Sequence, residues 1–124
     1  MKLMNNLSKD ALLETYRSQS FNNYQLICIE RGLSENIDVT IYAKPQYSFY
    51  TMDLIRVLLY ANIDVRSCFM FDKLDVNTLI DLYKEHKHDS RVAYKSDEEL
   101  ERVWLSSHNH VSSAVLDVVA SRFR

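Results

Sequence analysis

The chain of 124 residues is predicted to be an all-α, compact domain of five or six helices with a short helical-repeat core. Three observations lead to this prediction: glycine and proline are nearly absent, apolar residues recur with helical spacing, and one 26-residue stretch is followed by a similar one. One Gly and one Pro are too few for the tight corners of an all-β fold. Helices joined by short connections are therefore favoured.

Composition and charge narrow the functional classes. A hydrophobic content of 47% and a charged content of 26% are typical of a globular domain and argue against disorder. A net charge of −2 argues against the clustered Lys and Arg of a broad nucleic-acid surface, so no direct nucleic-acid partner is expected. The sequence shows no signal peptide and no membrane-spanning run. These features predict a cytoplasmic protein without a membrane partner.

An internal repeat is visible when residues 21–46 are aligned with residues 47–72. The tetrapeptide NIDV occurs in both, and seven of the 26 aligned positions are identical, where about one or two are expected by chance. The identical pairs outside NIDV are Tyr24/Tyr50, Ile29/Ile55 and Leu33/Leu59. Such a period is typical of stacked repeats. A decayed third copy is expected over residues 73–95, where Leu74, Leu79 and Leu82 follow the same spacing with an offset of 27.

Each clear copy predicts a helix with one apolar stripe at positions i, i+3 and i+7. The stripes are Leu26, Ile29 and Leu33 in the first copy and Met52, Ile55 and Leu59 in the second. Asn22 with Gln25 resembles a capping box at the start of the first helix.

The NIDV block is predicted to end each helix. Asn36 and Asn62 suit the left-handed conformation of a helix C-terminus. Asp38 and Asp64 are expected to cap a following short turn of helix, with the flanking Ile and Val packed inward. A short β-strand through VTIY is the competing interpretation of the first connector.

The flanking segments are also predicted to be helical. Residues 1–20 hold an N-terminal helix capped by Ser8, with an apolar side of Leu12, Leu13 and Tyr16. Residues 96–124 form a C-terminal helical segment that starts with the capping box from Ser96 to Glu99. Its apolar stripe is long enough to support a homodimer, and one long helix or two shorter ones both fit it. The stripe contains Leu100, Trp104, Val111, Val115 and Val118.

Catalytic and metal-binding patterns are weak. His86 with His88, and His108 with His110, are spaced at i and i+2, which on a helix places the rings on opposite sides. No metal and no cofactor are predicted, and the chain is expected not to be an enzyme. Cys28 and Cys68 align with Leu54 and Tyr42, so they are expected to be buried, reduced packing residues. The alternative from another class is a small metal-dependent nuclease or hydrolase that uses His108 or His110 with a carboxylate such as Asp89.

Aromatic residues are dense in the second copy, which suggests either a protein-binding surface or packing between repeats. We expect the contact candidates to be Tyr47, Phe49, Tyr50, Arg56 and Tyr60. Few basic residues lie near them, so stacking on RNA is disfavoured. A nucleic-acid-binding regulator is kept as a further alternative.

Residues 21–72 resemble a tandem repeat of uncharacterised proteins from Gram-positive phages and conjugative elements. The helix carries Leu26, Ile29, Gly32 and Leu33, and the connector carries Asp38, Val39, Tyr42, Ala43 and Pro45. The second copy keeps Asp64 and Val65 but reads Cys68-Phe69-Met70-Phe71 where the first has Y-A-x-P. The resemblance implies a mobile-element origin and no transferable activity. By association it implies an anti-CRISPR-like inhibitor that binds another protein, such as a host defence nuclease complex.

Overall fold

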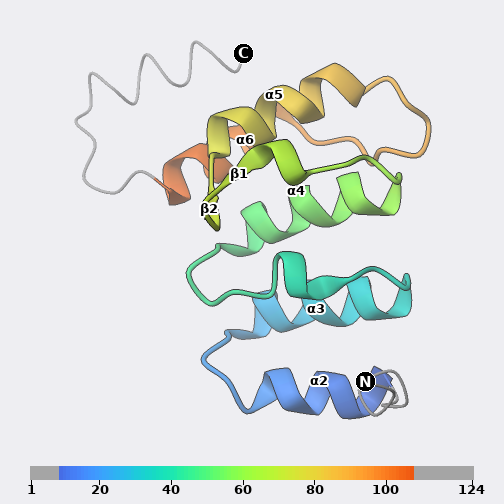
Figure 1. Cartoon of the computed structure of the whole chain (residues 1–124), viewed down its shortest axis with the longest axis vertical. Helices are drawn as coiled ribbons and strands as arrows, with labels where there is room; N and C mark the ends of the chain where they lie inside the picture. Colours follow the sequence, from blue (N-terminus) through green and yellow to red (C-terminus); the bar gives the residue numbers. More distant parts are fainter. Residues whose placement is uncertain (1–8, 108–124) are drawn as a thin grey trace.

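The computed structural model describes residues 9–107 (Figure 1). Most of this stretch is helical, which confirms the all-α prediction, with one small two-stranded sheet added. Two single turns of 3-10 helix, η1 and η2, follow α3 and α4. The elements in chain order are α2 (Lys9–Arg17), α3 (Asn23–Ser34), η1 (Val39–Ile41), α4 (Phe49–Tyr60), η2 (Arg66–Cys68), β1 (Phe69–Met70), β2 (Lys73–Leu74), α5 (Val76–His86) and α6 (Asp97–Ser106).

The helices are stacked along the long axis of the molecule in nearly the order of the chain (Figure 1). α2 packs on α3, α3 on α4, and both α5 and α6 close the far end against α4. Packing between sequence neighbours is the arrangement expected of a repeat stack. No helix within residues 9–107 has the length and apolar character needed to cross a bilayer.

The start of each repeat helix is set by a side-chain cap. Asn22 Oδ1 accepts a hydrogen bond from the Gln25 backbone N–H, and Gln25 Oε1 accepts one from the Asn22 backbone N–H, which confirms the capping box. Ser48 caps α4 and Asp75 caps α5. These caps lie at steps of 26 and 27 residues (48 − 22 and 75 − 48), so the third helix keeps the register of the sequence repeat.

The end of each repeat helix follows the NIDV prediction. Asn36 and Asn62 have φ values of 60° and 61°, the left-handed conformation that Asn tolerates well. Asp38 Oδ1 accepts from the Thr40 N–H at 3.2 Å, and Asp64 Oδ1 accepts in the same way from the Arg66 N–H at 2.9 Å. Both connectors then form a turn of 3-10 helix, so a strand through residues 39–42 does not form.

Where each repeat helix packs against its connector, a large and a small residue occupy opposite positions in the two copies. A Cβ atom at Gly32 would lie 2.0 Å from Tyr42 Oη and 2.6 Å from Val39 Cγ1, so only glycine admits the Tyr42 ring there. In the second repeat the equivalent positions (32 + 26 and 42 + 26) hold Leu58 and Cys68, both fully buried. The first copy thus pairs a small helix residue with a large connector residue, and the second copy pairs a large helix residue with a small connector residue.

The core is continuous from α2 to α6, and its centre is α4, which is buried along most of its length. Leu13 of α2 and Leu100 and Val103 of α6 belong to this core. Ser96 and Glu99 form the predicted capping box at the start of α6, which ends at Ser106. The predicted cap Ser8 and the stripe residues Val111, Val115 and Val118, with their part of the predicted homodimer contact, lie outside the described residues.

Candidate functional site

A tight β-hairpin follows the second connector, at the position where the Y-A-x-P of the first is lost. β1 and β2 pair antiparallel with Met70 opposite Lys73, so two residues alone make the turn. These two, Phe71 and Asp72, have φ values of 49° and 64°. Such a turn normally takes Asn-Gly, because a bulky side chain in the left-handed region is strained. Phe71 is nevertheless 94% exposed, so no core packing offsets that strain.

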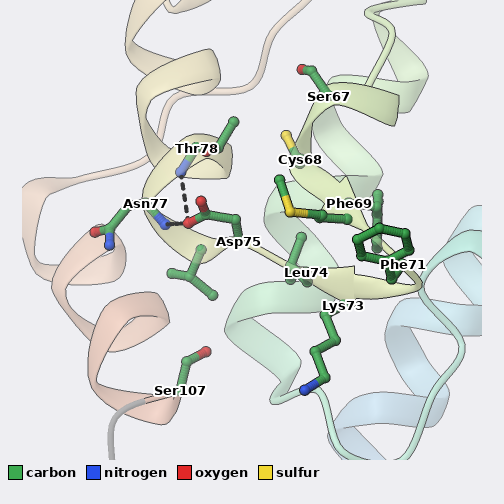
Figure 2. Close-up of a pocket in the computed structure, with 12 residues that line it drawn as sticks. Ser67, Cys68, Phe69, Phe71, Lys73, Leu74, Asp75, Asn77, Thr78 and Ser107 are labelled. Carbon is green, nitrogen blue, oxygen red and sulfur yellow. Dashed lines mark hydrogen bonds between the residues drawn. The ribbon is translucent and has the colours of Figure 1, made fainter.

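A groove of about 630 Å³ lies beside this hairpin (Figure 2). Figure 2 shows the hairpin on one side and the first turn of α5 on the other, with Ser107 at the lower edge. The backbone N–H of Asp75 donates to the Cys68 carbonyl at 2.7 Å and ties the two sides together at the base. Apolar side chains make much of the lining, and polar ones stand among them. The lining residues are 67–71, 73–78 and 107.

Two of the chemically active groups of this groove, the Asp75 carboxylate and the Cys68 thiol, are already engaged or unreactive. The Asp75 carboxylate accepts from the backbone N–H groups of Asn77 and Thr78 at the start of α5 (Figure 2). Burial raises the pKa of the Cys68 thiol, which keeps the sulfur protonated and unreactive at neutral pH. Lys73 is exposed. The chemistry available is therefore the binding of an apolar side chain, with hydrogen-bonding groups beside it.

Tyr47 is the predicted contact residue that lies nearest to this groove. It lines a neighbouring hollow of about 300 Å³ that shares Lys73, Leu74, Val76 and Ser107 with the groove. The Lys44 ammonium lies 5.8 Å from the centre of the Tyr47 ring and 5.5 Å from that of Phe69, so it links the first connector to the hairpin. Cation–π contacts of this kind orient both rings.

Phe49 and Tyr50 lie at the start of α4 in a separate aromatic group. The Phe49 ring centre is 5.4 Å from that of Tyr50 and 6.0 Å from that of Tyr24 on α3. Arg102 of α6 donates to the Tyr50 hydroxyl at 3.0 Å and stacks over its ring. Both predicted residues are half-buried, so they serve packing between elements as well as any contact with a partner.

Arg56 differs most from its predicted role, because its side chain lies inside the molecule and only 7% of the residue is exposed. Arg56 Nε donates to Asp53 Oδ1 at 2.9 Å, and Arg56 Nη1 donates to Glu35 Oε1 at 2.6 Å. The Lys95 ammonium pairs with the other oxygen of Asp53 and lies 3.4 Å from Glu99 Oε2. This ion cluster joins α4 to the end of α3 and to the start of α6.

Burial by itself would raise the pKa of the Asp53 carboxyl, but hydrogen bonds and charge from Lys95 and Arg56 outweigh that effect and lower it. Asp53 is thus ionised inside the protein. Its neighbour Cys28, whose sulfur lies 3.8 Å from Asp53 Oδ1, has its pKa raised to about 12 by burial and by the Asp53 charge. The predicted description of Cys28 and Cys68 as buried free thiols is confirmed.

Tyr60 lies at the far end of α4 from Phe49 and is exposed. It borders a hollow of about 440 Å³ with Arg31, Val57 and Arg91. The five predicted contact residues therefore do not form one surface: Tyr47 adjoins the hairpin groove, Phe49 and Tyr50 lie at one end of α4, Tyr60 lies at the other, and Arg56 is internal.

The residues of the enzyme alternative are only partly described. His108 and His110 lie outside the described residues. Asp89 accepts from the backbone and guanidinium of Arg91, which lowers its pKa to about 2 and makes it a weak base. Within residues 9–107, His, Cys, Asp and Glu do not gather in groups of three or more that could hold a metal ion.

Sequence reasoning missed Met70 and Phe71 as site residues. The available signal was the replacement of Lys44 and Pro45 by Met70 and Phe71 at the aligned positions of the second copy. A change from polar and turn-forming residues to large apolar ones, in a connector, marks an exposed hydrophobic site.

No protein-family model, no curated protein and no solved structure matches this chain at a significant level.

Proposed function

We propose that the chain is a protein-binding module whose contact surface is the hairpin groove with Met70 and Phe71 at its edge. The observation that carries the proposal is the state of Phe71, which is both strained in its backbone and almost fully exposed. Strained residues persist where surrounding structure holds them and tend to cluster at functional sites. An exposed Phe beside an exposed Met is also the composition enriched at protein interfaces.

The form of the site supports a protein partner. A two-residue turn holds Phe71 in one place, so its ordering is largely complete before binding. The groove behind the turn has room for an apolar side chain of the partner, and the Lys73 ammonium lies at its rim. Tyr47 extends the same side of the molecule and is the predicted contact residue that we retain there.

The experiment is affinity capture with the full chain from a host-cell lysate, followed by titration of the purified partner. We expect Phe71→Asn to weaken binding at least tenfold, because Asn suits the turn but removes the aromatic contact. The matched control is Tyr94→Ser, which removes another exposed aromatic side chain far along the sequence from the hairpin. Retention of the partner by Phe71→Asn with unchanged affinity would contradict the proposal.

The more specific role follows from the resemblance to phage and conjugative-element repeats. There we propose that the partner is a host defence nuclease complex and that binding inhibits it. Titrating the chain into the captured complex should then lower its cleavage rate at a fixed ratio, and Phe71→Asn should abolish this effect. A captured partner without defence activity would contradict this inhibitory role but not the proposal that the hairpin groove binds a protein.

A further inference from the structure

A second surface, separate from the hairpin groove, runs along α3. Tyr24, Ile27 and Arg31 follow each other at i, i+3 and i+7, so they lie on one face of the helix. Tyr24 is 69% exposed and Ile27 is 48% exposed, and Arg31 is exposed as well. We call these three residues the α3 stripe. Large apolar residues with such exposure on a helix face indicate a contact surface.

The second repeat shows how the equivalent face of α4 is covered by another segment of the chain. The equivalents of the α3 stripe on α4 (26 residues later) are Tyr50, Asp53 and Val57. Arg102 of α6 donates to the Tyr50 hydroxyl at 3.0 Å, and the Lys95 ammonium pairs with Asp53. Val57 borders a hollow together with Ser90, Arg91 and Ala93. Arg31 borders the same hollow, so the end of the α3 stripe lies beside the segment that covers α4. Residues 90–106 therefore cover on α4 the face whose equivalents on α3, Tyr24 and Ile27, are exposed.

The direction of this cover is also defined. Ala93 lies near Val57, Lys95 pairs with Asp53, and Arg102 contacts Tyr50. Residue numbers therefore rise along the covering segment while they fall along α4. The segment runs antiparallel to α4, begins in a turn in which the Val92 N–H donates to the Asp89 carbonyl, and is helical from Asp97 onward. A segment that bound the α3 stripe in the equivalent way would run antiparallel to α3.

We propose that the α3 stripe binds a segment of a partner protein that resembles residues 90–106 with two changes. Where α4 has Asp53 paired with Lys95, α3 has Ile27, so the partner needs an apolar residue in place of the lysine. Where α4 has Val57, α3 has Arg31, so the partner needs an acidic residue there. Both faces carry a tyrosine, Tyr24 on α3 and Tyr50 on α4. The partner segment therefore keeps a basic residue at the position of Arg102, where it would stack on Tyr24.

The Tyr24 ring is held for this contact. Its centre lies 6.0 Å from that of Phe49, which in turn packs edge-on against Tyr50. The two tyrosines, one covered and one open, are thus linked through a single phenylalanine. A basic residue over Tyr24 would continue the row that Arg102 begins over Tyr50.

The probe is a fluorescent peptide of residues 90–106 that carries Ala93→Glu and Lys95→Leu. A hydrocarbon staple in its helical half lowers the ordering cost of binding. We expect anisotropy titration against the full chain to give saturable binding, and backbone amide shifts to map to α3. Ile27→Asp should weaken this binding at least tenfold, because it sets a carboxylate against the leucine. Phe71→Asn and Glu85→Ala, which lie outside the stripe, should leave it unchanged.

A reversal of preference makes the test specific. The variant Ile27→Asp with Arg31→Val gives α3 the residue types of α4, so it should prefer the stapled peptide that keeps Ala93 and Lys95 over the substituted one. Equal affinity for both peptides, or no binding of the substituted peptide to the unmodified chain, would overturn the proposal.

Two other occupants of the stripe are separate outcomes, and each overturns the proposal. Sedimentation that shows a dimer lost in Ile27→Asp would place a second copy of this chain on the stripe. Shifts of the α3 amides on removal of residues 108–124 would place that segment there. Because the hairpin groove takes no part in the peptide assay, failure here is distinguishable from failure of the proposed function.

Discussion

Phe71 combines two properties that folding alone disfavours. Its φ of 49° lies in the left-handed region, where a side chain without a compensating local hydrogen bond is strained, and its ring lies in solvent. Asn36 and Asn62 adopt almost the same φ, but they are residues that tolerate it. This combination supports the contact surface proposed above.

Phe71→Asn is expected to raise the stability of the fold. Relief of backbone strain should increase the free energy of unfolding by about 1 kcal/mol, measured by urea denaturation. The control is Met70→Thr, which removes a neighbouring apolar group in β1 where the backbone is extended, and should leave stability nearly unchanged. A lower stability for Phe71→Asn would mean that the ring contributes to folding after all.

Asp53 is a second residue of interest, because the charged groups around it determine its contribution to stability. Its pKa is lowered in the folded protein, so its pairing with Lys95 and Arg56 stabilises the fold above the usual carboxyl range. That contribution is lost as the pH falls through the folded pKa, because the carboxylate is then protonated. The neutral form no longer balances the charges of the buried Arg56 and the partly buried Lys95.

Asp53→Asn is expected to lower the free energy of unfolding at pH 7 by about 3 to 5 kcal/mol, the usual effect of removing one partner from a buried ion pair. The difference from the unmodified chain should shrink when unfolding is followed below pH 4. The exposed pair of Asp64 with Arg66 is the control, and Asp64→Asn should change stability little. A pH-independent difference would show that packing, not charge, is lost.

Among the helices and connectors, the exchange of large and small residues links two elements of each repeat. Tyr42 fits because position 32 is glycine, and Leu58 is accommodated where the connector has Cys68. In each repeat, a change of side-chain size at the helix position therefore requires a matching change at the connector position.

Gly32→Leu and Tyr42→Cys test this coupling as a double-mutant cycle. Each single change should lower the free energy of unfolding by about 3 kcal/mol, the first through overpacking and the second through a cavity. The double variant reproduces the residue pair of the second repeat, so its loss should be smaller than the sum by about 2 kcal/mol. Additive losses in urea denaturation would mean that the two sites do not share one space.

Elements defined by local chemistry were predictable from the sequence. The caps at Asn22 and Ser96 and the left-handed Asn36 and Asn62 depend on residues within one turn, so their patterns are readable in the chain. The hairpin was not predictable, because Phe71-Asp72 lacks the Asn-Gly signal of a two-residue turn.

The candidate site was predictable only in part, for a related reason. Arg56 aligns with the exposed Glu30, so nothing nearby in sequence indicates that it is buried. Its ion cluster depends on Lys95, which is 42 residues from Asp53. Contacts at that distance are set by the packing of α6 on α4, which periodicity does not reveal.

In the whole molecule, the order of unfolding depends on how the repeats are joined. A short stack of repeats usually begins to unfold at its terminal repeats, because each unit contacts only its neighbours. Here the ion cluster draws Glu35 from the first repeat, Asp53 and Arg56 from the second, and Lys95 from the segment before α6. A unit that separates leaves an unbalanced charge in the others. The stack should therefore melt in a single all-or-none step, so that no partly opened form exposes the α4 core to aggregation.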